Sequence, residues 1–196
     1  MKDKVNKAKE VVLNGGVILY PTDTIWGIGC SPIIESAINK IFKIKRRNNN
    51  KLLISLVSSK EMLERYVKKI PEYVLKYLYD ESPTTIVYPK VRGLSQILYG
   101  KNDSIAFRLV KNNFCKALID QINTPLISTS ANISGNPFPK KFKEIDKKII
   151  TEVDYVVNFD DNKLKNLKPS RIIKVLLSGQ IEIIREWLMQ IKKFKN

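Results

Sequence analysis

The 196-residue chain contains no histidine. This absence excludes Ser–His and Cys–His nucleophile pairs and every metal site that needs an imidazole ligand. Any acid–base step must therefore use carboxylates, lysine, tyrosine, cysteine, water or the substrate itself. The two cysteines, Cys30 and Cys115, are too few for a tetrahedral zinc site or a disulfide framework. They favour a chain with reduced thiols in the cytoplasm.

The sequence also lacks long apolar runs and glycine-rich phosphate loops. No run approaches the roughly 20 residues that span a bilayer, and the opening MKDKVNKAKE contains no apolar signal-peptide core. We therefore expect a cytoplasmic protein without membrane contact. Neither GxxxxGK[ST] nor GxGxxG occurs, so a nucleotide would have to be held by side chains.

What the chain has in excess is positive charge, with a formal net charge of +16. Such a balance suits nucleic acid, nucleotides or anionic lipid as partners. Lysine, asparagine and isoleucine are abundant throughout the chain, however, so compositional bias explains the total equally well. The local placement of charges is the better guide to function.

The length predicts one domain over residues 1–196, and a hydrophobic content of 43% is enough for a core. Apolar periodicity predicts helices over residues 3–14, 32–44, 59–66, 71–79, 113–122 and 143–150. Strands are predicted over residues 17–20, 52–57, 84–88, 105–109, 126–128, 153–158, 172–175 and 181–184. The tail 187–196 is expected to continue as a helix. Interleaved helices and strands without a repeat indicate an α/β fold with a mixed sheet.

The stretch PTDTIWG, residues 21–27, follows the first predicted strand directly. Ligands of α/β proteins favour such strand ends. Thr22, Asp23 and Thr24 offer hydroxyls, a carboxylate and backbone amides to a small polar ligand. The alternative is a turn whose aspartate and threonines bond their own backbone.

A basic cluster follows the second predicted helix, in FKIKRRNNNK, residues 42–51. Arginine presents a planar fork to phosphate oxygens and lysine a point charge, so Lys45, Arg47 and Lys51 are candidate phosphate ligands. A solvated helix end, favoured by the helix dipole, is the alternative.

The third polar cluster is TPLISTSANISGNP, residues 124–137, where an apolar strand leads into serines and an asparagine. Hydroxyls and amides at Ser128, Ser130 and Asn132 can bind an anion or a ribose, and Gly135 lets backbone approach closely. A plain polar loop is the alternative. Together, the three clusters are expected to converge on one cavity.

The order of these motifs resembles the YrdC-like threonylcarbamoyl-AMP synthases. That family carries P-T-[DE]-T-x-[YW]-G, K-x-R and S-A-N-x-S-G, which match residues 21–27, 45–47 and 130–135. SPTTIVY (82–88), SIAFR (104–108), and KPSRII (168–173) followed by IEIIRE (181–186) are similar to its other strands. The resemblance covers roughly residues 5–187 and points to the short, single-domain branch.

The resemblance implies a twisted sheet with flanking helices around a large basic cavity. It implies condensation of L-threonine, bicarbonate and ATP into threonylcarbamoyl-adenylate and pyrophosphate. A threonylcarbamoyl transferase complex then modifies tRNA with the product. Mg²⁺ is expected with ATP, held mainly by phosphates, and no metal site is expected on the protein itself.

The resemblance also implies roles for individual residues. The expected L-threonine ligands are Thr24, Arg108 and Ser170, with Arg108 on the α-carboxylate. The residues expected to carry the chemistry are Lys45, Arg47, Ser130 and Asn132. The expected ATP ligands are Arg47, Lys51, Ser104, Ser128, Ser130, Asn132 and Arg185. Trp26 is expected to form a pocket wall and Asp23 to lock the turn.

Some positions depart from the family pattern. Arg46 and Asn48 replace the glycine and proline of the usual K-G-R-P, and Leu52 replaces a proline or glycine. Phe138 stands where a small polar residue is common, which leaves the nucleotide contacts of this loop open. Trp26 replaces the commoner tyrosine.

Three other functions remain open from the sequence. One is a non-catalytic module that binds double-stranded RNA or tRNA through its charge. Another is a ribosome- or tRNA-maturation factor that uses the cavity only for docking. The third is a different carbamoyl-transfer enzyme, because a related domain occurs in the much longer hydrogenase-maturation carbamoyltransferases.

Overall fold

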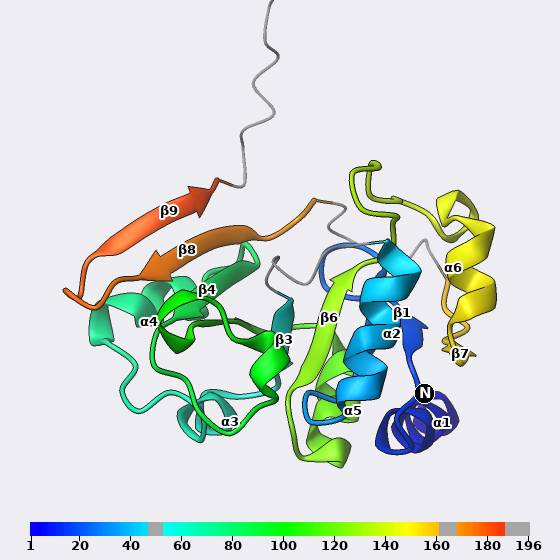
Figure 1. Ribbon diagram of the computed structural model, residues 1–196, viewed down its shortest axis with the longest axis horizontal. Coiled ribbons are helices and arrows are strands. Elements are labelled where there is room, and N and C mark those ends of the chain that lie inside the picture. The colour runs from blue at the N-terminus through cyan, green and yellow to red at the C-terminus, as the bar shows by residue number, and fades with distance from the viewer. Residues whose placement is uncertain (47–52, 161–167, 187–196) are drawn as a thin grey trace, which may run out of the picture.

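The computed structural model describes residues 1–46, 53–160 and 168–186 (Figure 1). Its described strands form one nine-stranded mixed sheet in the order β7-β1-β2-β6-β3-β5-β4-β8-β9. The strands are β1 (Ile18–Tyr20), β2 (Gly27–Cys30), β3 (Ile54–Val57), β4 (Thr84–Tyr88), β5 (Ile105–Leu109), β6 (Leu126–Ser130), β7 (Tyr155–Val156), β8 (Arg171–Val175) and β9 (Ile181–Arg185). The predicted α/β class with a mixed sheet is confirmed.

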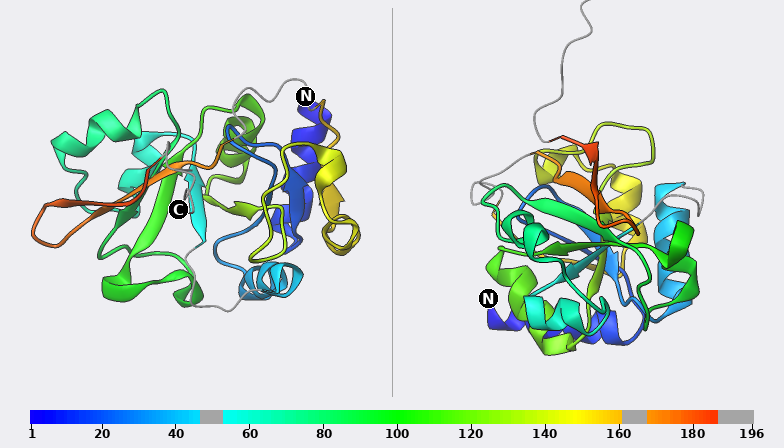
Figure 2. Two further views of the ribbon diagram at one scale, coloured as in Figure 1. Left: turned by 90° about the horizontal axis from the view of Figure 1, so that it is seen from above. Right: turned by 90° about the vertical axis from the view of Figure 1, so that its left-hand side faces the viewer.

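Helices cover the sheet from two sides. The α-helices are α1 (Lys2–Leu13), α2 (Glu35–Lys45), α3 (Lys60–Glu64), α4 (Glu72–Leu78), α5 (Asn113–Ile122) and α6 (Lys147–Glu152). Helix α2 lies in front of β6 in Figure 1 and α5 behind it, and the view from above in Figure 2 agrees. Helix α1 packs against α5, and α6 packs against α2.

The described part of the chain also contains three short 3₁₀ helices. They are η1 (Gln96–Leu98), η2 (Lys101–Asp103) and η3 (Phe142–Glu144). The first two lie in the segment 89–103, for which the sequence predicts only loop. The third precedes α6, so the helix predicted over 143–150 is in fact a 3₁₀ turn followed by a short α-helix. Asp146 separates the two, because its carboxylate accepts the amide of Lys148 as a helix cap.

Helices α3 and α5 begin at side-chain caps. Ser59 caps α3 by accepting the amide of Met62, and Asn112 caps α5 by accepting the amide of Cys115. Helix α5 ends at Asn123, whose φ of 53° lies in the left-handed region. Its buried residues recur at helical spacing and form the apolar face that joins the core.

The start of α2 predicted at residue 32 is wrong. The helix begins at Glu35, and Ile34 is its N-cap residue with an extended backbone. Ser31 is buried at the end of β2, where its hydroxyl accepts the amide of Ile33 in a local turn. The serine therefore caps a turn that precedes the helix.

Strand β2 was not predicted, because its sequence GIGC is poor in residues that favour strands. Pairing fixes it: β2 is antiparallel to β1 on one side and to β6 on the other. Gly29 is required there, since a Cβ at this position would lie 2.2 Å from the Ile127 carbonyl oxygen and 2.9 Å from the Tyr20 ring. Tertiary packing has overridden local propensity in this strand.

None of the described helices is long and apolar enough to cross a membrane.

Candidate functional site

A cavity of about 610 Å³ is lined by six described segments of the chain. They are the β1–β2 connection, β3, β4, β5, β6 with the loop that follows it, and the β8–β9 hairpin with the two residues before it. The volume falls in the range of small-molecule sites. The charged side chains among the described lining residues are Arg108 and Arg185, so the cavity is basic.

Strand register explains why these segments meet. Ser128 of β6 pairs with Ile54 of β3, and Ile54 pairs with Ala106 of β5. Ala106 in turn pairs with Val87 of β4. All four side chains line the cavity, because paired residues in adjacent strands point to the same face. The floor of the cavity is therefore one face of the sheet.

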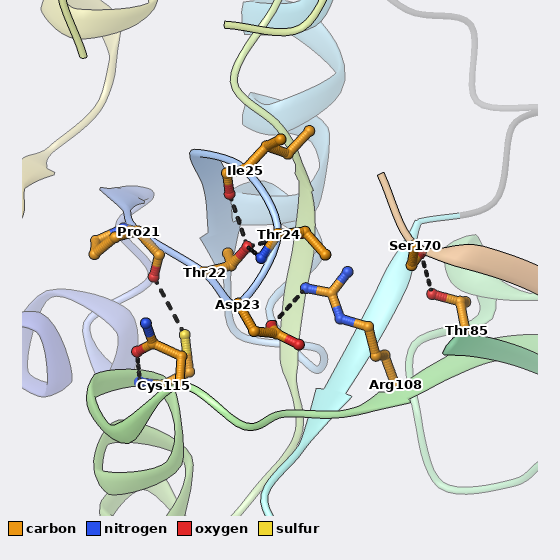
Figure 3. Close-up of polar contacts among 10 residues, drawn as sticks. Pro21, Thr22, Asp23, Thr24, Ile25, Thr85, Arg108, Cys115 and Ser170 are labelled. Atoms are coloured by element: carbon orange, nitrogen blue, oxygen red, sulfur yellow. Dashed lines mark hydrogen bonds and ion pairs between the residues drawn. The ribbon is translucent and has the colours of Figure 1, made fainter. Parts of the chain in front are cut away.

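The PTDT segment is a hydrogen-bonded turn that Thr22 holds together (Figure 3). The Thr22 hydroxyl donates to the Ile25 carbonyl oxygen at 2.7 Å and accepts the Thr24 amide at 3.0 Å. Its one proton is thereby used, so in its 2.9 Å contact with the Thr24 hydroxyl it is Thr24 that donates. Thr24 lines the cavity and keeps its oxygen lone pairs as acceptors.

The expectation that Asp23 locks this turn is wrong, because the hydrogen bonds that hold the turn come from Thr22. The Asp23 side chain instead reaches β5, where its Oδ1 lies 3.1 Å from Nη2 of Arg108 (Figure 3). Both side chains are buried, at 7% and 5% exposed. Asp23 Oδ2 and Arg108 Nε are buried without a hydrogen-bond partner. The pair is therefore held by a single contact and not by a bidentate fork.

A second hydroxyl pair lies on the other side of Arg108. The hydroxyls of Thr85 on β4 and Ser170 before β8 are 2.8 Å apart and buried (Figure 3). Nε and Nη2 of Arg185 both donate to the Ser170 carbonyl oxygen, at 3.1 and 2.7 Å. Burial, and then the nearby Arg108 charge, lower the pKa of Arg185. Two neighbouring guanidinium groups make this part of the cavity attractive to anions.

Lys45 lies at the end of α2, with 2% of its surface exposed. Its ammonium donates to the backbone oxygens of Ser130 and Asn132 and to Asn132 Oδ1. The Ser134 amide donates back to the Lys45 carbonyl oxygen at 2.9 Å. Lys45 thus holds the loop after β6 in place, and that loop carries Ser130 and Asn132 into the cavity lining.

The remaining predicted residues divide into three groups. Ser128 lines the cavity, and a Cβ on the neighbouring Gly27 would lie only 3.2 Å from its hydroxyl. Ser104 is buried just before β5 and does not belong to the lining, although strand alternation places it on the same face as Arg108. Arg47 and Lys51 lie outside the described residues.

Two aromatic residues belong to the described lining of the cavity. Trp26 does so as predicted, but its ring is fully buried, with its centroid 5.2 Å from that of Phe142. Phe138, one of the departures from the expected pattern, also lines the cavity.

The two cysteines do not supply a nucleophile. Both thiols are free and buried, and burial raises their pKa well above the ordinary value. Cys115 donates to the Pro21 carbonyl oxygen and so supports the base of the turn (Figure 3).

Residues 10–186 match the Sua5/YciO/YrdC family model, which is described as "Telomere recombination". The chain belongs to this family. A relative from Methanocaldococcus jannaschii, named "Putative threonylcarbamoyl-AMP synthase", is 37% identical over 188 residues. The match covers 94% of this chain and 86% of the relative.

Solved structures of family proteins share the fold. A P. abyssi Sua5 structure superposes with a TM-score of 0.83 at 26% identity, over 94% of this chain and 56% of Sua5. The chain thus spans little more than half of Sua5. A second Sua5 structure, complexed with L-threonine, gives a TM-score of 0.78 at 26% identity over 89% of this chain and 51% of Sua5. E. coli YciO gives 0.82 at 23% identity, over 98% of this chain and 93% of YciO.

Sequence reasoning missed the contacts that two residues make at the site. Asp23 was assigned to the turn, although the opposite charges of PTDT and SIAFR were a signal for its pairing with Arg108. Thr85 gave a weaker signal, because a threonine in a buried strand is ordinary. Only the pairing of β4 with β8, which places Thr85 opposite Ile172, brings it to the hydroxyl of Ser170.

Proposed function

We propose that the chain is an L-threonylcarbamoyladenylate synthase, which condenses L-threonine, bicarbonate and ATP into threonylcarbamoyl-AMP and pyrophosphate. One observation carries this proposal. Segments that are far apart in the sequence, PTDT, SIAFR, STSAN and KPS, bring Thr24, Arg108, Ser130 and Ser170 to one basic cavity. The name of the M. jannaschii relative supports the same reaction.

The amino acid occupies the part of the cavity around Arg108. The guanidinium pairs with the α-carboxylate of L-threonine. The Thr24 hydroxyl oxygen, whose own proton goes to Thr22, accepts a hydrogen bond from the substrate amine. Ser170 contacts the substrate from the opposite side, with Thr85 fixing its hydroxyl. The Sua5 complex with L-threonine supports this class of substrate.

ATP occupies the part of the cavity around the loop after β6. Ser128, Ser130 and Asn132 contact phosphate oxygens, and Arg185 flanks the nucleotide. Arg47 and Lys51 neutralise the triphosphate and the leaving pyrophosphate. Lys45 supports the site by holding the Ser130–Asn132 loop, and its direct contact with phosphate stays a prediction. Ser104 as an ATP ligand also stays a prediction.

Mg²⁺ enters with ATP. Among the described residues, no group of three histidine, cysteine or acidic side chains gathers where a cation would bind. Phosphate oxygens and water are the natural ligands of Mg²⁺ in such a site. The chain's part is to bind and orient the phosphates that carry the ion.

The reaction needs little from the protein beyond position and charge. The amine nitrogen of threonine attacks the bicarbonate carbon, water leaves, and a carbamate forms. A carbamate oxygen then attacks the α-phosphorus of ATP, and pyrophosphate leaves. Aligning these groups and neutralising the developing charge supply most of the rate. A chain without histidine and with two buried thiols is suited to this chemistry.

The product is an activated acyl-adenylate that a transferase must consume. We propose that a threonylcarbamoyl transferase complex passes the group to tRNA as threonylcarbamoyladenosine. In this proposal the chain forms one domain, and the transferase complex brings its product to the tRNA.

Pyrophosphate release from ATP and Mg²⁺ tests the proposal, with bicarbonate present and L-threonine present or omitted. Release is expected only with threonine. Arg47→Ala should abolish release and leave the circular dichroism spectrum unchanged. Lys43→Ala, an exposed change on α2, should retain it. Salt-dependent RNA binding without any pyrophosphate release would favour a non-catalytic RNA-binding or ribosome-maturation factor instead.

A further inference from the structure

The buried Asp23–Arg108 pair changes the charge that a ligand meets in the cavity. Arg108 lines the cavity, and Arg185 lies close enough for the Arg108 charge to lower its pKa. Two guanidinium groups alone would attract any small anion, including bicarbonate, phosphate and simple carboxylates. Asp23, 3.1 Å from Arg108 and 7% exposed, offsets one of these charges.

We propose that Asp23 is a specificity-determining residue, which makes the Arg108 site selective for zwitterionic α-amino acids over carboxylates that lack an amine. A carboxylate that approaches Arg108 is attracted by the guanidinium and repelled by Asp23 behind it. An α-amino acid brings an ammonium group next to its carboxylate, and this positive charge offsets the repulsion. In a buried site such like-charge terms are large because water screens them poorly.

The geometry of the pair allows Arg108 to contact Asp23 and a ligand at the same time. The contact joins one oxygen to one nitrogen, and Asp23 Oδ2 and Arg108 Nε remain without partners. A bidentate pair would occupy the guanidinium fork that the substrate carboxylate needs. The single contact fixes the orientation of Arg108 and leaves the rest of its fork for a ligand. The hydrogen bonds of Thr22 hold the turn that carries Asp23. The backbone of Asp23 is therefore held in place even without the contact to Arg108.

The inference rests on the proposed amino-acid substrate but not on the reaction. Isothermal titration calorimetry of the full chain measures it without turnover. The ligands are L-threonine, L-serine and (R)-3-hydroxybutyrate, which is threonine without its amino group. The variants are Asp23→Asn, Asp23→Glu and the matched control Asp120→Asn, an exposed site on α5 with the same change of charge.

The wild-type chain is expected to bind threonine at least about tenfold more tightly than 3-hydroxybutyrate, since one hydrogen bond to a charged group is worth that much. Asp23→Asn should weaken threonine binding and strengthen 3-hydroxybutyrate binding, so that the preference falls by about tenfold. Asp23→Glu should restore part of it, and Asp120→Asn should leave it unchanged.

Each other outcome has a definite meaning. If Asp23→Asn weakens both ligands equally, Asp23 has only a structural role and the inference is wrong. If the wild-type chain prefers serine over threonine and still discriminates against 3-hydroxybutyrate, the proposed substrate is wrong and the inference stands. If it binds none of the three ligands, both are wrong.

Discussion

Lys45→Met tests how the loop that carries Ser130 and Asn132 is held in place. The Lys45 ammonium is buried and donates to three oxygens of this loop. Methionine matches the lysine stem in size and shape and removes only the charge and the donors. The variant therefore separates the contacts of the ammonium from the packing of the side chain.

The contacts predict a substantial loss of stability. Each hydrogen bond from a charged donor contributes about 1.5–3 kcal/mol. The three contacts involve two residues of one loop, so their energies do not add in full, and methionine also removes the cost of burying the charge. We expect the free energy of unfolding to fall by about 3 kcal/mol, a large part of the 5–15 kcal/mol typical of a domain.

Urea denaturation and steady-state kinetics measure the two consequences. With a slope of about 2 kcal/mol/M, the urea midpoint should fall by about 1.5 M. The KM for ATP should rise more than the KM for threonine, because Lys45 supports the Ser130 loop and not Thr24 or Arg108. Lys43→Met, two residues earlier and exposed, should change neither quantity. A Lys45→Met midpoint within the error of the wild-type value would refute this account of the loop.

Two further predictions concern the framework around the cavity. Gly29→Ala places a Cβ 2.2 Å from the Ile127 carbonyl oxygen, so the free energy of unfolding should fall by about 1–3 kcal/mol. Calorimetry should show a lower melting temperature, and an unchanged one would contradict the packing described. Partial burial opposes ionisation of Asp154, but hydrogen bonds from Lys40 and a backbone amide outweigh it and lower the pKa of its carboxyl. Stability from a lowered pKa is present above the unfolded pKa and lost as pH falls through the folded one. Asp154→Asn should therefore unfold more easily than wild type near neutral pH, and the two urea midpoints should converge as the pH falls below the lowered pKa of Asp154.

The elements that sequence patterns predicted are those in which local signals and tertiary packing agree. Helix α5 has a capping Asn112, a periodic apolar face and a left-handed end at Asn123. Strand β2 has no such signal, since two of its four residues are glycines. Glycine is needed there because neighbouring strands leave too little space for a side chain. Its existence depends on partners from β1 and β6, which the local sequence does not reveal.

The candidate site was predictable to a similar extent. Motif order identified the segments that meet at the cavity, and Thr24, Arg108 and Ser170 lie there as expected. It did not reveal which side chains contact each other. Thr22, and not Asp23, holds the turn, because the Thr22 side chain bends back to the backbone while the Asp23 side chain reaches β5. The sequence does not show which of the two side chains takes which direction.

The most direct test of the proposed function is mass spectrometric detection of the product. The purified chain would be incubated with ATP, Mg²⁺, L-threonine and isotope-labelled bicarbonate, and the adenylate fraction analysed at once. The account predicts threonylcarbamoyl-AMP that carries the label from bicarbonate, in amounts equal to the pyrophosphate released, and none with Arg108→Ala. Pyrophosphate release without labelled adenylate, or no release with any substrate combination, would contradict it.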